Sequence, residues 1–483
     1  MGLVGLAATG ICSMLGAGIN VVPFMIQRSV PGIGPWVLST YVFAALPAIL
    51  AAMAYAILAS AMPRAGGSYV YASRSLSPYL GFVASFSQWF GLSIAIGVVS
   101  YLIVPFLRDI AVALGQNALA ATLETGPVRV GVALALLWLF AGVNLLGVRL
   151  YERTLVPLMI AMFVLGGIVI VAGFSFEQAD FAAALLEREG RTLAGVDPPP
   201  LTMGAFLAAG AVLFASFIGF DSIAQAGGEA RRSDRNLPIA IALAVGVVGS
   251  FYMLFTAAVY HAVPWSYIAE EAAVRDVTAP GLLGYLLSPG WTVAIVAGAA
   301  IALINDLPAM LLAVSRLMFA WAEDGIFPRG VARVHPRWHT PWVAIVASAV
   351  MASVGIVGCQ VAGDFFLGVD LLVTSMLVNF LLMALSVLAL PRVNPTLAER
   401  VKVARTRTIQ VPLMLVCEAL LATFLVVHVW KDLTAPGVAW YLRSTCVWFA
   451  VMAVASVVFL REIRQLRRSG ADVEAVFSAL PPE

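Results

Sequence analysis

Apolar segments long enough to cross a lipid bilayer recur twelve times along this 483-residue chain. A helix rises about 1.5 Å per residue, so about 20 residues cross the roughly 30 Å of hydrocarbon. Hydrocarbon offers no partner to a free amide or carbonyl, so such segments must be helical. The sequence therefore predicts an all-α polytopic membrane protein. The expected spans are residues 3–28, 35–62, 78–107, 128–148, 153–174, 204–229, 238–262, 290–321, 341–361, 366–390, 411–430 and 438–460.

Charged residues support this class and indicate an orientation. They make up 11% of the chain, against about a quarter in soluble domains. Arginines gather in alternate loops, as at Arg64 and Arg74 or Arg231 and Arg232, whereas the loops between them are acidic or poor in cations. The positive-inside rule then predicts a multi-pass plasma-membrane protein with both termini in the cytoplasm. The basic loops suit anionic lipid headgroups, and no nucleic-acid partner is implied.

Two of the spans carry a break near their middle. Residues 15–20 read LGAGIN, and residues 214–224 read FASFIGFDSIA, with Gly219 beside Asp221. A glycine-weakened backbone and a carboxylate at membrane depth are costly unless the segment lines a polar cavity. A pair of interrupted helices, one in each half of the chain, is a sequence signature of a transporter binding site.

The breaks also predict how the chain is divided. Spans 1–5 and 6–10 each open with a broken span, and an odd number of spans inverts the second unit relative to the first. The expected parts are a first unit at 1–174, an extracellular connector at 175–203, a second unit at 204–391, a basic cytoplasmic loop at 392–410, spans 11 and 12 at 411–461 and a cytoplasmic tail at 462–483.

Four motifs, taken together, resemble the amino acid–polyamine–organocation (APC) superfamily of secondary transporters. They are GAGIN at 16–20, PRAGGSYVY at 63–71, FIGFDSIA followed by Glu229, Arg235 and Pro238, and SRLMFAWAEDGIFP at 315–328. The resemblance implies an amino acid permease of the LeuT-type fold. Such a fold has 12 transmembrane helices: a 5+5 inverted repeat with helices 1 and 6 discontinuous, plus two appended helices.

In the first break, Gly16 and Gly18 bracket Ala17. Free amides there, with the positive end of the following half-helix, would bind a substrate carboxylate. The alternative is that the small residues serve close helix packing. Leu15 and Asn20 flank these positions, and the Asn20 amide could reach the substrate or cap the backbone.

In the second break, the carbonyls of Phe217, Ile218, Gly219 and Phe220 suit a substrate ammonium, as do aromatic faces. The alternative for the two phenylalanines is apolar packing. Relatives in the superfamily commonly have a bulky aromatic gate where this chain has Ala215, which implies a roomier pocket or a gate supplied by another residue. Phe214, next in sequence, is a candidate for that gate.

Charged residues near the breaks are candidates for coupling and gating. A buried Asp221 could exchange a proton with the cavity, or it could cap a helix. Glu229 and Arg235 are expected to form an inner-gate or orienting ion pair.

Span 8 places Asn305 and Asp306 before Pro308, and three interpretations of this pair stay open: a Na⁺ site, a proton site and a structural kink. In LeuT-type transporters a Na⁺ site commonly lies between the first span and span 8. Residues 152–172 contain no lysine, which excludes the lysine switch that some proton-coupled relatives carry in span 5.

These features predict a secondary active transporter of an amino acid, with a neutral one favoured, working by alternating access with Na⁺ or H⁺ coupling. An amino acid or amine antiporter, a polyamine or organic-amine importer and a non-transporting membrane sensor remain alternatives. The spans contain no HExxH, GxSxG or clustered His/Asp set, so we expect no enzyme. We expect no cofactor beyond Na⁺ as a coupling ion, and a monomer or homodimer.

Overall fold

The computed structural model describes residues 1–483 except 194–196, 199, 363–364, 436–438 and 482–483, and the side chain of Ala17 also lies outside the described part. The exceptions fall in the expected connector at 175–203, between the expected spans 341–361 and 366–390, at and just before the start of the expected span 438–460, and in the expected tail at 462–483.

The long helices follow the apolar segments of the sequence. They are α1 (Leu3–Met14) with α2 (Ala17–Ser29), α3 (Val37–Ala61), α5 (Pro78–Ala113), α7 (Gly126–Leu145), α8 (Val148–Ser175), α10 (Met203–Phe214), α12 (Ser233–Ala262), α15 (Pro289–Glu323), α16 (Trp342–Ala362), α17 (Phe366–Val393), α19 (Arg407–Thr434) and α20 (Ser444–Arg468).

Shorter helices connect the long ones. They are α4 (Gly67–Ser75), α6 (Asn117–Glu124), α9 (Gln178–Glu189), α11 (Asp221–Gln225), α13 (Trp265–Val274), α14 (Ala279–Leu283), α18 (Pro395–Ala398) and α21 (Val473–Ser478), with 3₁₀ turns η1 (Gly34–Trp36), η2 (Ala215–Phe217), η3 (Gly227–Glu229), η4 (Arg329–Ala332) and η5 (Trp440–Leu442).

Within the described residues, 11 helical segments are long and apolar enough to cross a membrane. The expected span at 204–229 differs from them: a shorter apolar helical segment, Met203–Phe217, is followed by turns. The all-α polytopic class is thus confirmed. The structural reason for the short sixth segment is its break, which stops the helix before it has crossed the bilayer.

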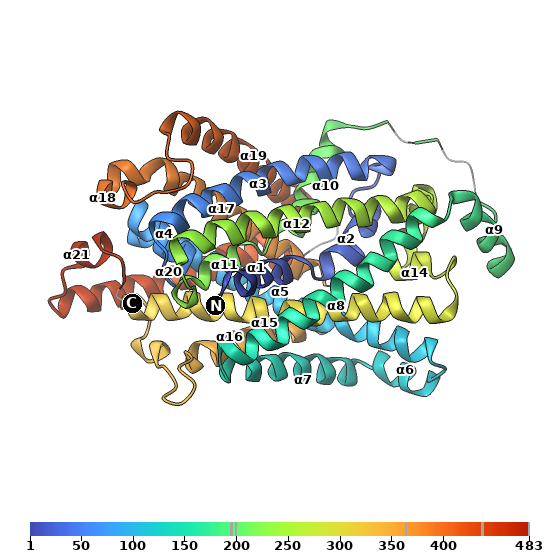
Figure 1. Cartoon of the computed structure of the whole chain (residues 1–483), viewed down its shortest axis with the longest axis horizontal. Helices are drawn as coiled ribbons and strands as arrows, with labels where there is room; N and C mark the ends of the chain where they lie inside the picture. The colour runs from blue at the N-terminus through green and yellow to red at the C-terminus, as the bar shows by residue number, and fades with distance from the viewer. Residues whose placement is uncertain (194–196, 199, 363–364, 436–438, 482–483) are drawn as a thin grey trace.

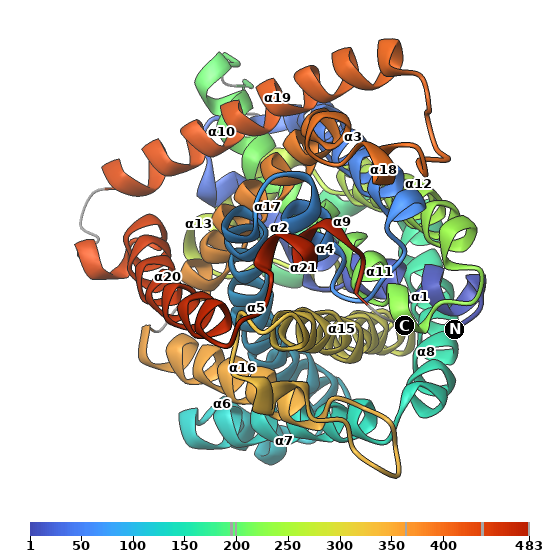
Figure 2. The same ribbon diagram turned by 90° about the vertical axis from the view of Figure 1, so that its left-hand side faces the viewer.

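The long helices run side by side, with both chain ends toward one end of the bundle and α9 and α14 at the other (Figure 1). Seen end-on, α15 and α5 lie in the middle, and α7 and α16 flank them on one side (Figure 2). The outer surface carries exposed apolar side chains such as Val171, Val426 and Phe449. Such a surface suits lipid rather than water.

The first break separates α1 from α2 at Leu15 and Gly16. The Leu15 amide still bonds the Ile11 carbonyl at 2.9 Å, but Gly16 has φ −108° and ψ −132°, outside the helical region. Glycine lowers the cost of leaving the helix here.

The second break follows α10. One turn of η2 leads to Ile218 in an extended conformation and then to Gly219, whose φ is +134°. That region is open to glycine and strains other residues. A Cβ at this position would also collide with the Ser13 carbonyl. The breaks therefore pack directly against each other, and the Ser13 and Ser222 hydroxyls bond across them at 2.9 Å.

Candidate functional site

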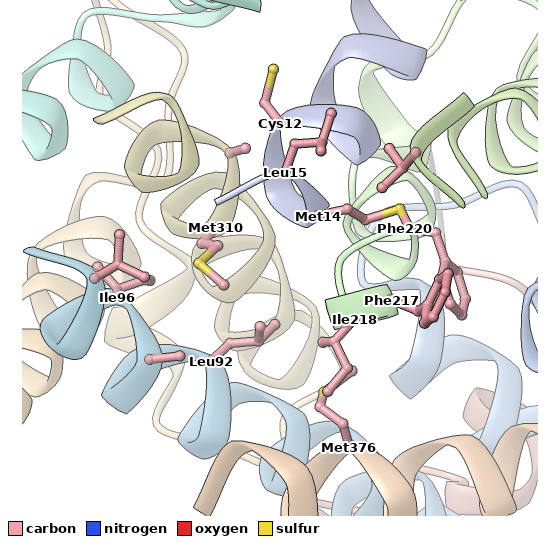
Figure 3. Close-up of a cluster of buried hydrophobic side chains, with 14 of the residues drawn as sticks. Cys12, Met14, Leu15, Leu92, Ile96, Phe217, Ile218, Phe220, Met310 and Met376 are labelled. Carbon is pink, nitrogen blue, oxygen red and sulfur yellow. The ribbon is translucent and has the colours of Figure 1, made fainter. Parts of the chain in front are cut away.

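A cavity of about 90 Å³ lies between the two breaks and is closed on its other sides by α5, α15 and α17. Figure 3 shows Met14 and Leu15 at the end of α1, and below them Met310 of α15 and Ile218 of the second break. The polar side chains that line the cavity are Ser13, Ser216 and Asp306. The rest of the wall is glycine or apolar: Met14, Gly16, Gly18, Val21, Val22, Ala95, Val98, Val99, Leu102, Ala215, Ile218, Met310, Phe365, Gly368, Val369 and Leu372.

Asp306 brings a carboxyl group to the first break. Its side chain extends from α15 so close to Gly16 that a Cβ there would collide with Oδ2. The residue is 3% exposed, and Oδ1 has no hydrogen-bond partner among the described residues. Buried carboxyl groups are normally paired or hydrogen-bonded. Asp306 is therefore open to a ligand that supplies a donor or a positive charge.

Tyr252 of α12 contacts the first break, and the sequence alone did not indicate this contact. Its hydroxyl donates to the Met14 carbonyl at 2.5 Å. A Cβ on Gly18 would lie 3.1 Å from the Tyr252 hydroxyl oxygen. One carbonyl that the break frees is thus already satisfied. The sequence signal was a tyrosine in the mostly apolar span 238–262.

Leu15 and Asn20 face away from this cavity. Both line a separate space of about 20 Å³, together with Met162 of α8 and Phe251 of α12. Of the predicted residues in the first break, Gly16 and Gly18 line the central cavity, and the side chain of Ala17 lies outside the described part.

The residues of the second break divide between the cavity and the surrounding helices. Ala215 and Ile218 line the cavity. Phe217 instead packs edge-on against Tyr41, with ring centroids 5.5 Å apart. Phe220 stacks on Phe380 of α17 at 5.2 Å.

The predicted gate residue Phe214 also packs outside the cavity. It lies against Phe380 of α17 and Phe424 of α19, each at a centroid distance of 5.9 Å. Within the described residues, the aromatic side chain that lines the cavity is Phe365, which precedes α17.

Asp221 is the first residue of α11 and lies directly after the second break. Its Oδ1 accepts from the Gly219 amide at 3.0 Å, and its Oδ2 accepts from the Gln88 side chain. Gln88 in turn accepts from Ser68 at 2.6 Å and from Gln225 at 3.2 Å. Asp221 is thus a fully hydrogen-bonded acid in a buried polar network, it holds the Gly219 amide of the break rather than capping α11, and it does not line the cavity.

Asn305 and Asp306 point to different sides of α15, as consecutive residues of a helix do. The Asn305 amide lies 2.9 Å from the Cys12 sulfur, whereas Asp306 lines the cavity. Asp306 is therefore the member of this pair that could meet a coupling ion or a substrate in the cavity.

A sequence model of the amino acid permease family matches residues 1–459. The chain belongs to the amino acid permease family. The permease is 30% identical to an uncharacterized transporter of Mycobacterium tuberculosis over 73% of this chain and 72% of that protein. It is 24% identical to the methylthioribose transporter of Bacillus subtilis over 95% of this chain and 92% of that protein. It is 25% identical to the low-affinity putrescine importer of Escherichia coli over 71% and 69%. The protein is thus a multi-pass membrane transporter.

At the end of the permease that carries the chain termini, Glu229 pairs with Arg316. The Arg316 Nε donates to Glu229 Oε1 at 2.6 Å. Arg235, which the sequence suggested as the partner, is exposed. The Arg316 side chain is 5% exposed, so it lies deep enough to reach Glu229 beneath the surface. Arg316 belongs to the motif at 315–328, but its distance from Glu229 in sequence hid the pair.

Two larger spaces lie on either side of the central cavity. One of about 300 Å³ reaches Arg28 and Lys431, and it shares Val21, Val22 and Phe365 with the central cavity. The other, of about 500 Å³, is lined by Arg64, Glu229 and Arg316. Following the orientation expected from the sequence, with both termini in the cytoplasm, we call them the outer and the inner vestibule. The residues that line both the cavity and the outer vestibule are apolar, whereas the cavity and the inner vestibule share no lining residue among those described.

Proposed function

We propose that this permease is a secondary active transporter that moves a small amine-bearing substrate across the plasma membrane by alternating access, coupled to Na⁺ or H⁺. The observation that carries the proposal is the cavity between two helix breaks with the unpartnered carboxyl of Asp306 in its wall. A buried polar group at the middle of a transporter is where substrate and coupling ion bind.

In alternating access, the binding site is open to one side of the membrane at a time, while a closed layer of protein separates it from the other side. Phe365 and the valines beside it form a thin cover toward the outer vestibule. The Glu229–Arg316 pair and a backbone bridge between Ala65 and Ala226 close the opposite side. With both termini in the cytoplasm, substrate enters through the outer vestibule, and opening of the Glu229–Arg316 pair releases it inward.

The cavity favours a substrate with one positive charge. Asp306 is the one carboxylate among the described residues that line it, and most of the wall is aliphatic. Such a wall stabilises an apolar chain, and the carboxyl attracts an ammonium. A neutral amino acid and a monoamine both meet these conditions. Each chain holds a whole cavity, so a monomer suffices, and a homodimer would work through independent sites.

Coupling is proposed to run through Asp306. Asp221 already has hydrogen-bond partners on both oxygens, whereas Asp306 faces the cavity. A Na⁺ ion at Asp306 would take further oxygen ligands from the first break, since Asn305 is turned toward Cys12. A proton at Asp306 would neutralise the same carboxyl.

Proteoliposomes test this function. We expect the purified permease to accumulate a labelled neutral amino acid or monoamine above the outside concentration under an inward Na⁺ or H⁺ gradient, and ionophores to abolish the accumulation. Asp306→Asn should remove at least 90% of uptake. Glu418→Gln is the matched control, because Glu418 is an embedded carboxyl on α19 that does not line the cavity.

Binding of a substrate without accumulation under any gradient would contradict transport and favour a membrane sensor. Accumulation that needs a trapped substrate inside but no ion gradient would favour an antiporter. Unchanged gradient dependence in both Asp306→Asn and Asp221→Asn would contradict coupling through a carboxyl group.

A further inference from the structure

We propose that Asp306 occupies the place where an amino acid's carboxylate would bind, so that the permease takes a monoamine without a carboxylate. The substrate class is a primary alkyl- or arylalkylamine with a short apolar chain. This inference rests on the proposed transport function and narrows its substrate.

The first step concerns the start of α2. A helix leaves the amides of its first turn without partners inside the helix, and its dipole makes that end positive. The 13-residue helix α2 begins at Ala17 with no side-chain cap on its Gly16 position. An anion is expected to bind there, and for a zwitterionic amino acid that anion would be its carboxylate.

The second step is that this protein brings its own carboxylate to that place. Asp306 reaches Gly16 from α15, and the missing Cβ of Gly16 makes the approach possible. The side chain is 3% exposed, so solvent does not screen it. A substrate carboxylate at the same helix end would face a like charge across a short distance of low dielectric, which opposes binding.

The third step is the lack of a cation for Asp306. Lysine, arginine and histidine are absent from the described residues that line the cavity. Oδ1 of Asp306 has no partner in the described part of the chain. A buried carboxylate without a partner is costly. An ammonium group has three donors and a positive charge. It can therefore supply both the hydrogen bond that Oδ1 lacks and the cation that the carboxylate lacks.

The fourth step distinguishes a monoamine from a diamine. Apart from Asp306 and the hydroxyls of Ser13 and Ser216, the cavity wall is apolar or glycine and includes several valines, Leu102, Leu372 and Met310. A second ammonium would lie against these aliphatic side chains. In the outer vestibule it would meet two cations, Arg28 and Lys431, against the one carboxylate of Asp370 among the described lining residues. Either position disfavours a second positive charge, whereas an apolar chain fits the wall.

The test uses pairs of compounds that differ only in a carboxylate. Leucine is compared with 3-methylbutylamine, phenylalanine with phenethylamine, and lysine with cadaverine, by calorimetric binding to the purified permease. 3-Methylbutylamine should bind at least tenfold more tightly than leucine, and phenethylamine at least tenfold more tightly than phenylalanine. 3-Methylbutylamine should also bind at least tenfold more tightly than cadaverine. The wild-type comparison needs no variant, so it is independent of any folding defect.

Two variants then assign the effect to Asp306. Asp306→Asn should weaken the binding of 3-methylbutylamine at least tenfold. It should also reduce the permease's preference for this amine over leucine, because no negative charge then opposes a carboxylate at the helix end. Glu418→Gln should leave both affinities unchanged. Monodisperse elution of each variant from a sizing column is the control for folding.

Tighter binding of leucine than of 3-methylbutylamine would overturn the inference but leave amino acid transport standing. Stabilisation by Na⁺ that Asp306→Asn abolishes, together with leucine binding, would assign Asp306 to the ion instead. Binding of a sugar such as methylthioribose with no amine binding would overturn the inference and the amine-bearing substrate of the proposed function. Binding of none of the compounds would also contradict both.

Discussion

The side-chain hydroxyls of Ser13 and Ser222 hydrogen-bond at 2.9 Å and so join the two helix breaks directly. Ser13 precedes the end of α1, and Ser222 lies in the first turn of α11. Because Gly219 also packs on the Ser13 backbone, the two unwound segments support each other. Neither break could close into regular helix without displacing the other.

The first prediction concerns Gly219. Its φ of +134° strains any residue with a Cβ, and that Cβ would collide with the Ser13 carbonyl. We expect Gly219→Ala to lower the free energy of unfolding by about 3 kcal/mol and to abolish uptake. Gly246→Ala in α12 is the control, since its Cβ would meet nothing within 4 Å, and it should change stability by at most about 1 kcal/mol. Equal melting temperatures of the two variants in detergent would contradict the packing of the breaks.

The second prediction concerns the Glu229–Arg316 pair. The Arg316 side chain is buried, whereas that of Glu229 is 20% exposed. Removing the Glu229 charge leaves a buried guanidinium unpaired, which costs up to roughly 3–5 kcal/mol, on the side that we propose to be closed. Glu229→Gln should therefore favour the inward-open state. A cysteine at Ala226, which is fully buried, should then react at least tenfold faster with a maleimide added from the inner side.

Glu323→Gln is the control for this labelling, because Glu323 also lines the inner vestibule but is exposed. It should leave the labelling rate unchanged. A Glu229→Gln variant that labels no faster than this control would mean that the pair does not hold the inner side closed.

The third prediction concerns the end of the chain. Arg74, 1% exposed, donates to Asp324 at 2.5 Å and to the Ala479 carbonyl at 3.1 Å. Its guanidinium lies 5.1 Å from the ring centroid of Phe477. Phe477→Ala should lower the free energy of unfolding by about 3 kcal/mol, and Glu474→Gln, on the exposed side of α21, should leave it unchanged. Thermal melting would measure both effects. A Phe477→Ala variant with an unchanged melting temperature would show that the packing of the tail on Arg74 does not stabilise the fold.

The fourth prediction concerns pH at the opposite end of the molecule. A hydrogen bond from Tyr285, and then Arg191, lower the pKa of Glu189 at the end of α9. A carboxyl with a lowered pKa adds stability above its unfolded pKa and loses it as the pH falls through the folded value. The packing of α9 on Tyr285, whose ring also lies 5.4 Å from that of Phe181 between centroids, should therefore persist from pH 7 to pH 5 and weaken below about pH 4.

Tyr285→Phe removes the main cause of the lowered pKa and should move this release to higher pH. Glu187→Gln is the control, because Glu187 is an exposed carboxyl on the same helix. Hydrogen exchange of the buried Phe181 and Leu185 amides, corrected for intrinsic rates, reports the release. The same midpoint in both variants would contradict the role of Tyr285.

The sequence indicated the architecture because it follows from local rules. Apolar length marks the spans, and glycine inside an apolar span marks the breaks, together with a carboxylate in the second of them. The breaks lie at Leu15–Gly16 and near Gly219. Helix α9, within the expected connector, was not foreseen. It forms around a capping box of Glu177 and Asp180.

The direction of each side chain at the breaks did not follow from the sequence. Once a helix unwinds, its 3.6-residue period no longer tells which residues share a face. Asn20 therefore lies in a separate space, and Phe217 packs on Tyr41. Pairs such as Glu229 with Arg316 or Asp221 with Gln88 join distant segments, and only the packing of the bundle brings them together.

The most direct test of the account is a cryo-electron microscopy map of the permease in lipid nanodiscs saturated with 3-methylbutylamine. The account predicts ligand density in the cavity between the breaks, with the amine nitrogen within about 3 Å of Asp306 Oδ1. An empty cavity at saturation, or ligand density in the inner vestibule beside Glu229 instead, would contradict it.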